Sequence, residues 1–478
     1  MTWDRVSQAL ELDHLPDEVL GMIFVKCLPS PDRLLCFFTN AKEAPLLLVL
    51  VCKRWRRVAL STPRLWMHIS IESKDTSNLR PEIRALRMFS ERSSKLPLSL
   101  SFWNNDNIKA VCKTWAFRKA VAKYLHRCGT VTISTTRLVT LRWLVPLLTG
   151  AEQLHHLHID IHTSDDSSLF LVDSDPRNSL VLPHEVTSRL GSLRIDDYGV
   201  TIIRVVAPIS LCVTLRKIVL SSPLPWSTLL RFIEHCPNIE ELCISILINR
   251  NFPLKSPLTS PNLRRFSLDH GARTPFLQMG RDRGVVIHFP SLTELVLKRA
   301  IEPLIFRTIF GASPNVKFIL VDGRLMPSTA TAFEKLTTNL RLFPSLETLI
   351  IRDCIPRRVA LLPMLAVSSA LANHGQSSDV CPKLKRLFLG STSAWDGNVV
   401  TAVLGLVKSR CMLDSGADND NPTHARVHTL QELVIFEEDR HEESCWEILT
   451  THPDMIKCVE NGLTLSMFQK GGFYCYRH

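Results

Sequence analysis

The sequence predicts an α+β protein, in which a small helical N-terminal domain precedes a long strand–helix array with a curved parallel sheet. Three observations lead to this fold class. Residues 12–71 carry apolar side chains at helical spacing. A short apolar motif then recurs along the rest of the chain. Stretches with helical spacing lie between its copies, which favours parallel strands joined by helices.

Composition places this 478-residue chain among globular proteins, because 45% of its residues are hydrophobic and 22% are charged. The net charge of +11 favours an acidic protein, nucleic acid or an anionic membrane as partner without choosing among them, and a solvated basic surface explains it equally well. The 14 cysteines form no C-x-x-C pair, which is typical of thiols in a reducing compartment. The N-terminus lacks a signal-like apolar core, and the densest apolar run, 45–52, is too short to span a bilayer. We therefore expect an intracellular protein, cytoplasmic or nuclear, with no membrane partner.

The first expected helix lies in "DHLPDEVLGMIFVKCLP", residues 13–29. Asp13 is the expected N-cap, Pro16 suits the first turn, and Pro29 ends the helix. The apolar stripe consists of Leu15, Val19, Leu20, Ile23, Phe24 and Cys27.

A second helix is expected over residues 44–60, ended by Thr62-Pro63. Its basic cluster, Lys53–Arg57, lies mostly off the apolar face, which indicates either contact with an acidic partner or a solvated surface. Two or three short helices bury little area, so the unit is expected to lean on a partner or to cap the next domain. The apolar face consists of Leu47, Leu48, Val51, Trp55 and Val58.

These motifs resemble a known family. "LPDEVLGMIF" followed by "LVCKRWRRVALSTPRLW" is similar to the F-box, specifically to the F-box proteins abundant in mushroom-forming fungi. In that family the helices dock on the small Skp-type adaptor of a cullin–RING ubiquitin ligase. The resemblance implies an adaptor-binding set of Leu15, Pro16, Leu20, Ile23, Phe24, Val51, Cys52, Trp55, Leu65 and Trp66.

The pattern L-x-x-L-x-L recurs ten times, with Ile, Val or Phe allowed at the Leu positions. Five of the nine spacings between copies lie between 24 and 29 residues, as in leucine-rich repeats. Two earlier strands are expected at 97–102 and 130–136. The copies start at Leu154, Leu190, Leu215, Ile239, Leu263, Leu292, Val316, Leu346, Leu384 and Leu430.

The predicted fold is thus an N-terminal helical F-box followed by a degenerate leucine-rich-repeat α/β solenoid with a curved parallel sheet. The expected divisions are a tail (1–11), the F-box (12–71), connecting helices and first repeats (72–136), the solenoid (137–460) and a C-terminal tail (461–478).

Side chains alternate along a strand, so the positions between the motif leucines should face the concave surface. The fifth positions of later copies are apolar, which predicts either a binding groove for a substrate or for the chain's own tail "GGFYCYRH", or strands buried on both faces. The substrate-binding candidates are Arg265, Asp269, Glu294, Val296, Lys298, Leu320, Ile350, Arg352, Phe388 and Val434.

No phosphate-binding, nucleophile-elbow or zinc-protease motif occurs, so we expect no enzyme, no catalytic residue and no cofactor. In "HHLHIDIH", His156 and His158 share a face and Asp160 follows, but no recognised metal-ligand spacing is present, and no metal site is expected.

The resemblance implies the substrate receptor of a Skp–cullin–F-box ubiquitin ligase, with a Skp-type adaptor, a cullin and an unknown protein substrate as partners. A non-degradative adaptor-bound scaffold and a plain leucine-rich-repeat interaction protein remain open. Nucleic acid is not expected, because basic residues are spread along the chain. An unrecognised hydrolase would need a polar constellation that the sequence does not show.

Overall fold

The computed structural model describes residues 15–29, 42–72, 80–103, 115–136, 138–162, 179–197, 204–206, 212–247, 258–270, 287–298, 313–322, 338–352, 365, 380–391, 397–411, 430–437, 445–469 and 472–476. The chain divides into two compact units, Met1–Ser222 and Pro223–His478.

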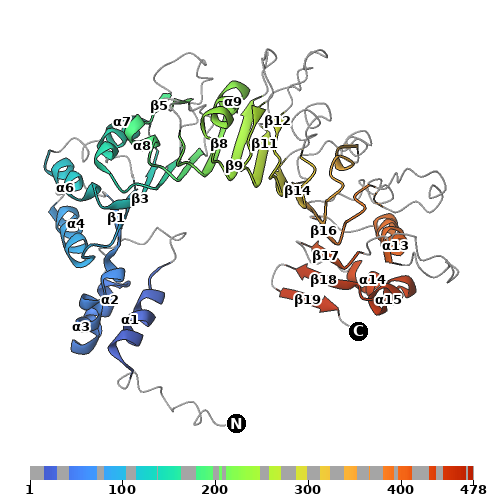
Figure 1. Ribbon diagram of the computed structural model, residues 1–478. Coiled ribbons are helices and arrows are strands. Elements are labelled where there is room, and N and C mark those ends of the chain that lie inside the picture. The colour runs from blue at the N-terminus through green and yellow to red at the C-terminus, as the bar shows by residue number, and fades with distance from the viewer. Residues whose placement is uncertain are drawn as a thin grey trace, which may run out of the picture. The chain divides into compact units, whose positions relative to one another are not determined.

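The first unit begins with short helices and continues into strands (Figure 1). The helical part comprises α1 (Asp17–Lys26), α2 (Leu46–Val51), α3 (Lys53–Ser61) and the 3₁₀ turn η4 (Pro63–Trp66). The later helices are α4 (Arg80–Arg92), α6 (Trp115–Leu125), α7 (Leu138–Leu144), the 3₁₀ helix η5 (Val145–Gly150) and α8 (His184–Thr187).

The main sheet of this unit is parallel, with strand order β1-β2-β3-β4-β6-β8. Helices α4, α6 and α7 lie along one face of its strands (Figure 1). A separate small parallel pair joins β5 (Ser179–Val181) to β7 (Arg204–Val206). The strands of the main sheet are β1 (His68–Glu72), β2 (Leu98–Trp103), β3 (Cys128–Thr135), β4 (His156–Ile161), β6 (Ser192–Asp197) and β8 (Lys217–Pro225).

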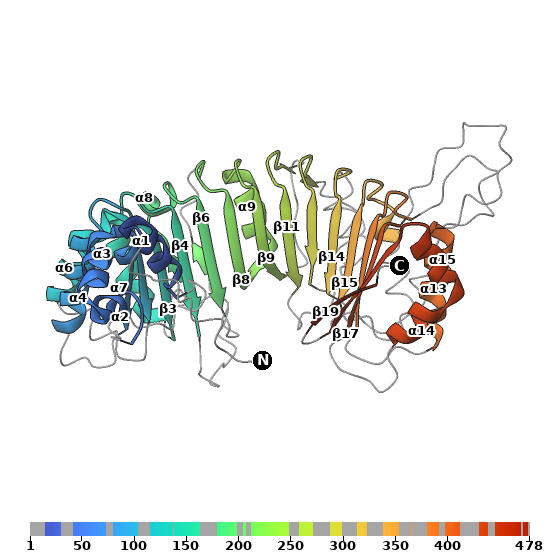
Figure 2. The same ribbon diagram turned by 90° about the horizontal axis from the view of Figure 1, so that it is seen from below.

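The second unit carries parallel strands in the order β9-β11-β13-β14-β15-β16-β17-β18, followed by antiparallel β19. Helices α13, α14 and α15 lie beside the last of these strands (Figure 2). The strands are β9 (Glu241–Leu247), β11 (Arg265–His270), β13 (Glu294–Leu297), β14 (Phe318–Asp322), β15 (Thr348–Arg352), β16 (Arg386–Ser391), β17 (Glu432–Glu437), β18 (Thr464–Gln469) and β19 (Gly472–Tyr476). The remaining elements are α9 (Trp226–His235), the paired β10 (Leu258–Thr259) and β12 (Ile287–His288), α13 (Gly397–Cys411), α14 (Cys445–Thr451) and α15 (Pro453–Glu460).

The sequence motif locates the strands closely. In each of the ten motif copies, the third residue is the first residue of a strand. The first, fourth and sixth motif residues of every copy are buried, as Leu154, Leu157 and Ile159 illustrate for β4. The expected strands at 97–102 and 130–136 are confirmed as β2 and β3.

Within each unit, backbone hydrogen bonds repeat at the turns before successive motif strands. The amide of the second motif residue donates to the carbonyl oxygen of the second motif residue of the preceding strand: Arg264 to Glu240, Thr293 to Arg264 and Lys317 to Thr293, each at 2.9 Å. This ladder satisfies backbone groups that would otherwise be buried unpaired, and it keeps successive strands in step.

Three expectations differ from the structure. The helix expected over 44–60 is broken, because Cys52 is extended (φ −154°, ψ 172°) and its Sγ caps α3 by accepting from the Trp55 amide. Pro16 is the N-cap of α1 and does not lie in its first turn, and Asp13 lies outside the described residues. Residues 461–478, expected to be a tail, contain β18 and β19.

Part of the helical spacing expected between the motif copies, including residues 302–310, falls outside the described residues. Within the residues that the structure does describe, no helix combines the length and the apolarity needed to cross a bilayer.

Candidate functional site

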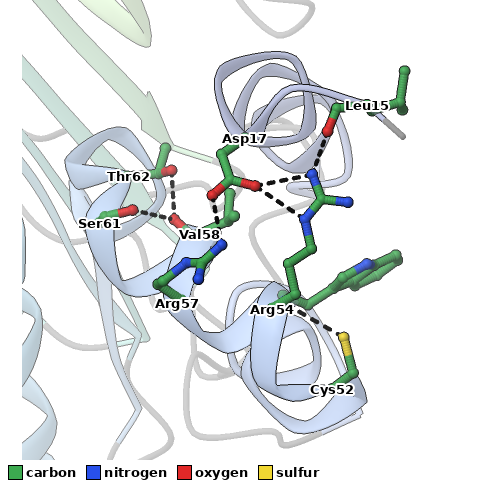
Figure 3. Close-up of polar contacts among 9 residues, drawn as sticks. Leu15, Asp17, Cys52, Arg54, Arg57, Val58, Ser61 and Thr62 are labelled. Atoms are coloured by element: carbon green, nitrogen blue, oxygen red, sulfur yellow. Dashed lines mark hydrogen bonds and ion pairs between the residues drawn. The ribbon is translucent and has the colours of Figure 1, made fainter. Parts of the chain in front are cut away.

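An ion-pair network joins α1 to α3 (Figure 3). Arg54 Nε donates to Oδ1 of Asp17 at 3.0 Å, and Arg57 donates to Oδ2 at 3.0 Å. Arg54 also donates to the carbonyl oxygen of Leu15, just before α1. Hydrogen bonds from Arg54 and then Arg57 lower the pKa of Asp17 below its ordinary value. Two residues of the basic cluster Lys53–Arg57 therefore hold the helices together rather than only facing solvent.

The interior of these helices is apolar and closely packed. Leu20, Phe24 and Val58 are each at most 2% exposed, and the Phe24 ring lies 4.8 Å from that of Trp55. A Cβ on Gly21 would lie 3.0 Å from Oγ1 of Thr62, so the absence of a side chain lets α1 approach the end of α3.

Trp66 connects this helical part to the rest of the first unit. Its side chain is fully buried, and Nε1 donates to the Ala59 carbonyl oxygen at 2.9 Å. Its ring meets that of Phe89 on α4 edge to face, with centroids 5.0 Å apart. The Arg92 guanidinium lies 4.5 Å from the ring centroid, within cation–π range. Trp66 thus anchors the helical domain to α4.

Large apolar side chains on α1 and α2 remain exposed. Met22 is 64% exposed and Ile23 39%, while Leu50 and Val51 are 59% and 53% exposed. These side chains lie close together on two short helices, so they leave an apolar surface in contact with water. A binding partner can cover that surface. The exposed apolar set consists of Met22, Ile23, Leu47, Leu50 and Val51.

The structure divides the ten predicted adaptor-binding residues between surface and interior. Leu20 and Phe24, predicted to contact the adaptor, are each only 1% exposed and pack inside the domain. The exposed members are Pro16, Ile23, Val51 and Cys52; the half-buried ones are Leu15 and Trp55; the buried ones are Leu20, Phe24, Leu65 and Trp66.

Sequence reasoning missed Met22 and Leu50, because it followed one helical stripe and treated residues 44–60 as a single helix. The break at Cys52 resets the helical phase, so Leu48 and Val58 point inward while Leu47 and Val51 are exposed. Counting apolar residues off the stripe would have found Met22.

A row of apolar side chains crosses the second unit. Val296, Leu320, Ile350, Phe388 and Val434 are direct partners on the adjacent strands β13 to β17. They alternate with the buried motif residues and so lie on the opposite face, which we call the open face. All are half-buried except Val434, which is 1% exposed. The five predicted apolar positions therefore form one continuous row.

Charged candidates flank this row. Arg265 Nε lies 3.6 Å from Oε2 of Glu294, its register partner, so these two predicted residues neutralise one another. Lys298 and Arg352 are exposed. Asp269 is a strand residue of β11, but its side chain lies outside the described residues.

The chain's own tail takes a different place from the groove considered above. β19 pairs antiparallel with β18, so that Gly472 lies opposite Gln469 and Tyr476 lies opposite Leu465. Residues 472–476 thus extend the sheet edge, and their backbone does not run across the apolar row.

In the first unit, a cluster of charged side chains lies on the corresponding open face, opposite the buried motif residues of β4. Nε2 of His158 on β4 lies 2.8 Å from Oδ1 of Asp160 and 3.1 Å from Oδ2 of Asp196 on β6. Arg194 Nε lies 2.5 Å from the same oxygen of Asp196. Burial alone would lower the pKa of His158, but hydrogen bonds to Asp160 and Asp196 outweigh it and raise that pKa to about 9. Burial alone would raise the pKa of Asp196, but hydrogen bonds from His158 and Arg194 outweigh it and lower that pKa.

Comparison with known families bears on the N-terminal helices. Residues 12–72 match the family described as F-box-like. This chain therefore carries an F-box-like domain. F-box domains typically bind Skp-type adaptors. No curated protein matches the chain.

Proposed function

We propose that this protein is the substrate-recognition subunit of a Skp–cullin–F-box ubiquitin ligase. Its F-box-like domain docks a Skp-type adaptor, which brings a cullin, and the open face of the strand array binds a protein substrate. The protein itself catalyses no reaction. It raises the effective concentration of the bound substrate near the ligase's ubiquitin-loaded enzyme.

The observation that carries the adaptor half is the exposed apolar set within the F-box-like domain. Large apolar anchors dominate the energy of protein interfaces when they are fully covered. The buried residues Leu20, Phe24 and Trp66 contribute indirectly, because they fix the helices that present the exposed ones.

The substrate half rests on the regularity of the strand array. The motif locates parallel strands in both units, and within each unit the hydrogen-bond ladder repeats from one strand to the next. We propose that these strands are leucine-rich repeats, which within each unit stack on their neighbours as in a solenoid and expose one face of the sheet. The apolar row from Val296 to Val434 is the proposed contact for an apolar segment of the substrate.

A capture experiment in cells tests the two halves separately. The tagged full-length chain should retain adaptor, cullin and a set of further proteins. An Ile350→Ser/Phe388→Ser variant should keep adaptor and cullin but lose some of those proteins, because the apolar row is interrupted at two adjacent strands. An Ile448→Ser variant is the matched control, since Ile448 is 47% exposed on α14, away from the row.

Three outcomes would change the account. Equal capture of every protein by the row variant and the control contradicts the substrate half. Capture of neither adaptor nor cullin by the wild type contradicts the adaptor half and leaves a repeat-based interaction protein. Captured proteins that are never ubiquitylated in a reconstituted ligase contradict the degradative role and indicate a scaffold.

A further inference from the structure

A group of potential metal ligands lies on the open face of the first unit, outside the F-box-like domain. The strands β4 and β6 are adjacent and parallel, and they lie side by side in Figure 2. Their register pairs His158 with Arg194 and Asp160 with Asp196. His158 and Asp160 lie two residues apart on β4, and both are therefore close to Asp196 on β6, although Asp196 is distant in sequence.

The two distances from His158 to the carboxylates lie near those expected around a single coordinated ion. Nitrogen and oxygen ligands of zinc lie about 2.0–2.2 Å from the metal, so neighbouring ligand atoms lie about 3–3.5 Å from one another. His158 Nε2 is 2.8 Å from Asp160 and 3.1 Å from Asp196, and all three ligand atoms lie within 4.8 Å of one another.

One imidazole nitrogen serves two carboxylates in this arrangement. A ring nitrogen of histidine carries at most one hydrogen, yet Nε2 of His158 faces oxygens of two different carboxylates. The two carboxylates must share that hydrogen. A metal ion in its place would coordinate the imidazole nitrogen and both carboxylates at once.

The surroundings also suit a metal. The side chain of Asp196 is 8% exposed and that of Asp160 14%, while His158 is 29% exposed, so the group is shielded below and open to solvent on one side. Arg194 holds Asp196 by a hydrogen bond, as outer-shell donors hold ligating carboxylates in many metal sites. Its side chain is 51% exposed.

We propose that His158, Asp160 and Asp196 form a binding site for a divalent transition-metal ion of the zinc class. Imidazole favours zinc-class metals over magnesium or calcium, which prefer oxygen ligands alone. Three protein ligands leave coordination positions open toward solvent, as in sites that also accept water or a group from a bound molecule. The site is independent of the adaptor-docking proposal.

The sequence pattern did not predict this site, because residues 155–162 were considered as a single strand without their neighbours in the sheet. There His156 and His158 share a face with Asp160, but His156 is exposed and does not belong to the group. The third ligand comes from the neighbouring strand, and only the register shows it.

The test uses chelator-treated full-length protein and zinc. Bound zinc is measured by equilibrium dialysis and atomic spectroscopy for the wild type, His158→Gln and Asp196→Asn, with circular dichroism to confirm folding. His156→Gln is the matched control, needed because the chain has 17 histidines and 14 cysteines. The wild type and the control should each bind about one zinc ion more per chain than the two site variants.

Cobalt distinguishes this site from thiol sites elsewhere. Cobalt bound at His158 and two carboxylates should show weak visible absorption bands without the intense thiolate charge-transfer bands, and Asp196→Asn should abolish them. Equal zinc content in the wild type and both site variants overturns the proposal, and so does a cobalt spectrum that Asp196→Asn leaves unchanged. Failure of the wild type to retain any zinc at micromolar free concentration overturns it as well.

Discussion

The anchoring role of Trp66 predicts a large and local loss of stability on its removal. Trp66 is fully buried, packs against Phe89 and donates from Nε1 to the Ala59 carbonyl oxygen. The other donor to that oxygen is the Thr62 amide, at the longer distance of 3.4 Å. Trp66→Ala thus removes a core side chain and also weakens the pairing of a buried carbonyl.

The magnitude follows from these contacts. Truncating a buried Trp or Phe to Ala costs about 3–5 kcal/mol, because the lost transfer energy adds to that of the cavity. Trp66→Phe keeps most of the ring but loses the hydrogen bond, which costs about 1–3 kcal/mol when the buried partner is left poorly satisfied. The difference in the free energy of unfolding between Trp66→Ala and Trp66→Phe measures the packing of the ring, including its contact with Phe89.

Amide hydrogen exchange measures this effect locally, at the interior of α3. Each ~1.4 kcal/mol lost from local stability speeds exchange about tenfold. Trp66→Ala should therefore speed the exchange of the Val58 and Ala59 amides about a hundredfold or more, and Trp66→Phe by about tenfold. Trp143→Ala is the control, because Trp143 is 39% exposed. Equal exchange in Trp66→Ala and Trp143→Ala would refute the anchoring argument.

Buried charges and thiols give three further predictions. Arg410→Met should lower the stability of the second unit by at least about 3 kcal/mol in thermal denaturation, because it leaves three buried carbonyl oxygens without the guanidinium; an unchanged melting temperature contradicts this. In metal-free protein, folding raises the pKa of His158 to about 9, so its stabilisation is complete below about pH 6.5 and is lost as the pH rises through about 9; an NMR titration with an ordinary midpoint contradicts this. Iodoacetamide should modify exposed Cys27 before Cys128 and Cys381, because burial raises the pKa of both thiols to about 12; equal labelling in peptide mass spectra contradicts this.

The repeat pattern predicted the strands well because their side chains obey a simple alternation. In every copy the motif leucines face the interior, and the residue between the last two of them faces the other way, as His158 does in β4. Such strands are locally encoded, and periodicity suffices to find them. Strand β18 was missed because Leu463, Leu465 and Met467 alternate as buried residues, but Glu460 stands three positions before Leu463, where the motif requires an apolar residue.

The candidate site was less accessible to sequence reasoning, since it depends on phase and register. One extended residue, Cys52, decides which apolar residues of α2 and α3 face inward. The family resemblance assigned Leu20, Phe24 and Ile23 to the same interface. Only the packing shows that Leu20 and Phe24 are buried while Ile23 is exposed. The grouping of His158 with Asp196 follows from strand register, which single-strand patterns do not contain.

Binding of a purified Skp-type adaptor to the purified full-length chain tests the central claim most directly. Isothermal titration should show tight one-to-one binding by the wild type and by Ile448→Asp, whose exposed apolar side chain lies outside the F-box-like domain. Ile23→Asp/Val51→Asp should weaken the affinity by at least about a hundredfold, since two anchors of the exposed apolar set are lost. Wild-type protein that fails to bind, or a double variant that binds as tightly as Ile448→Asp, would contradict the account.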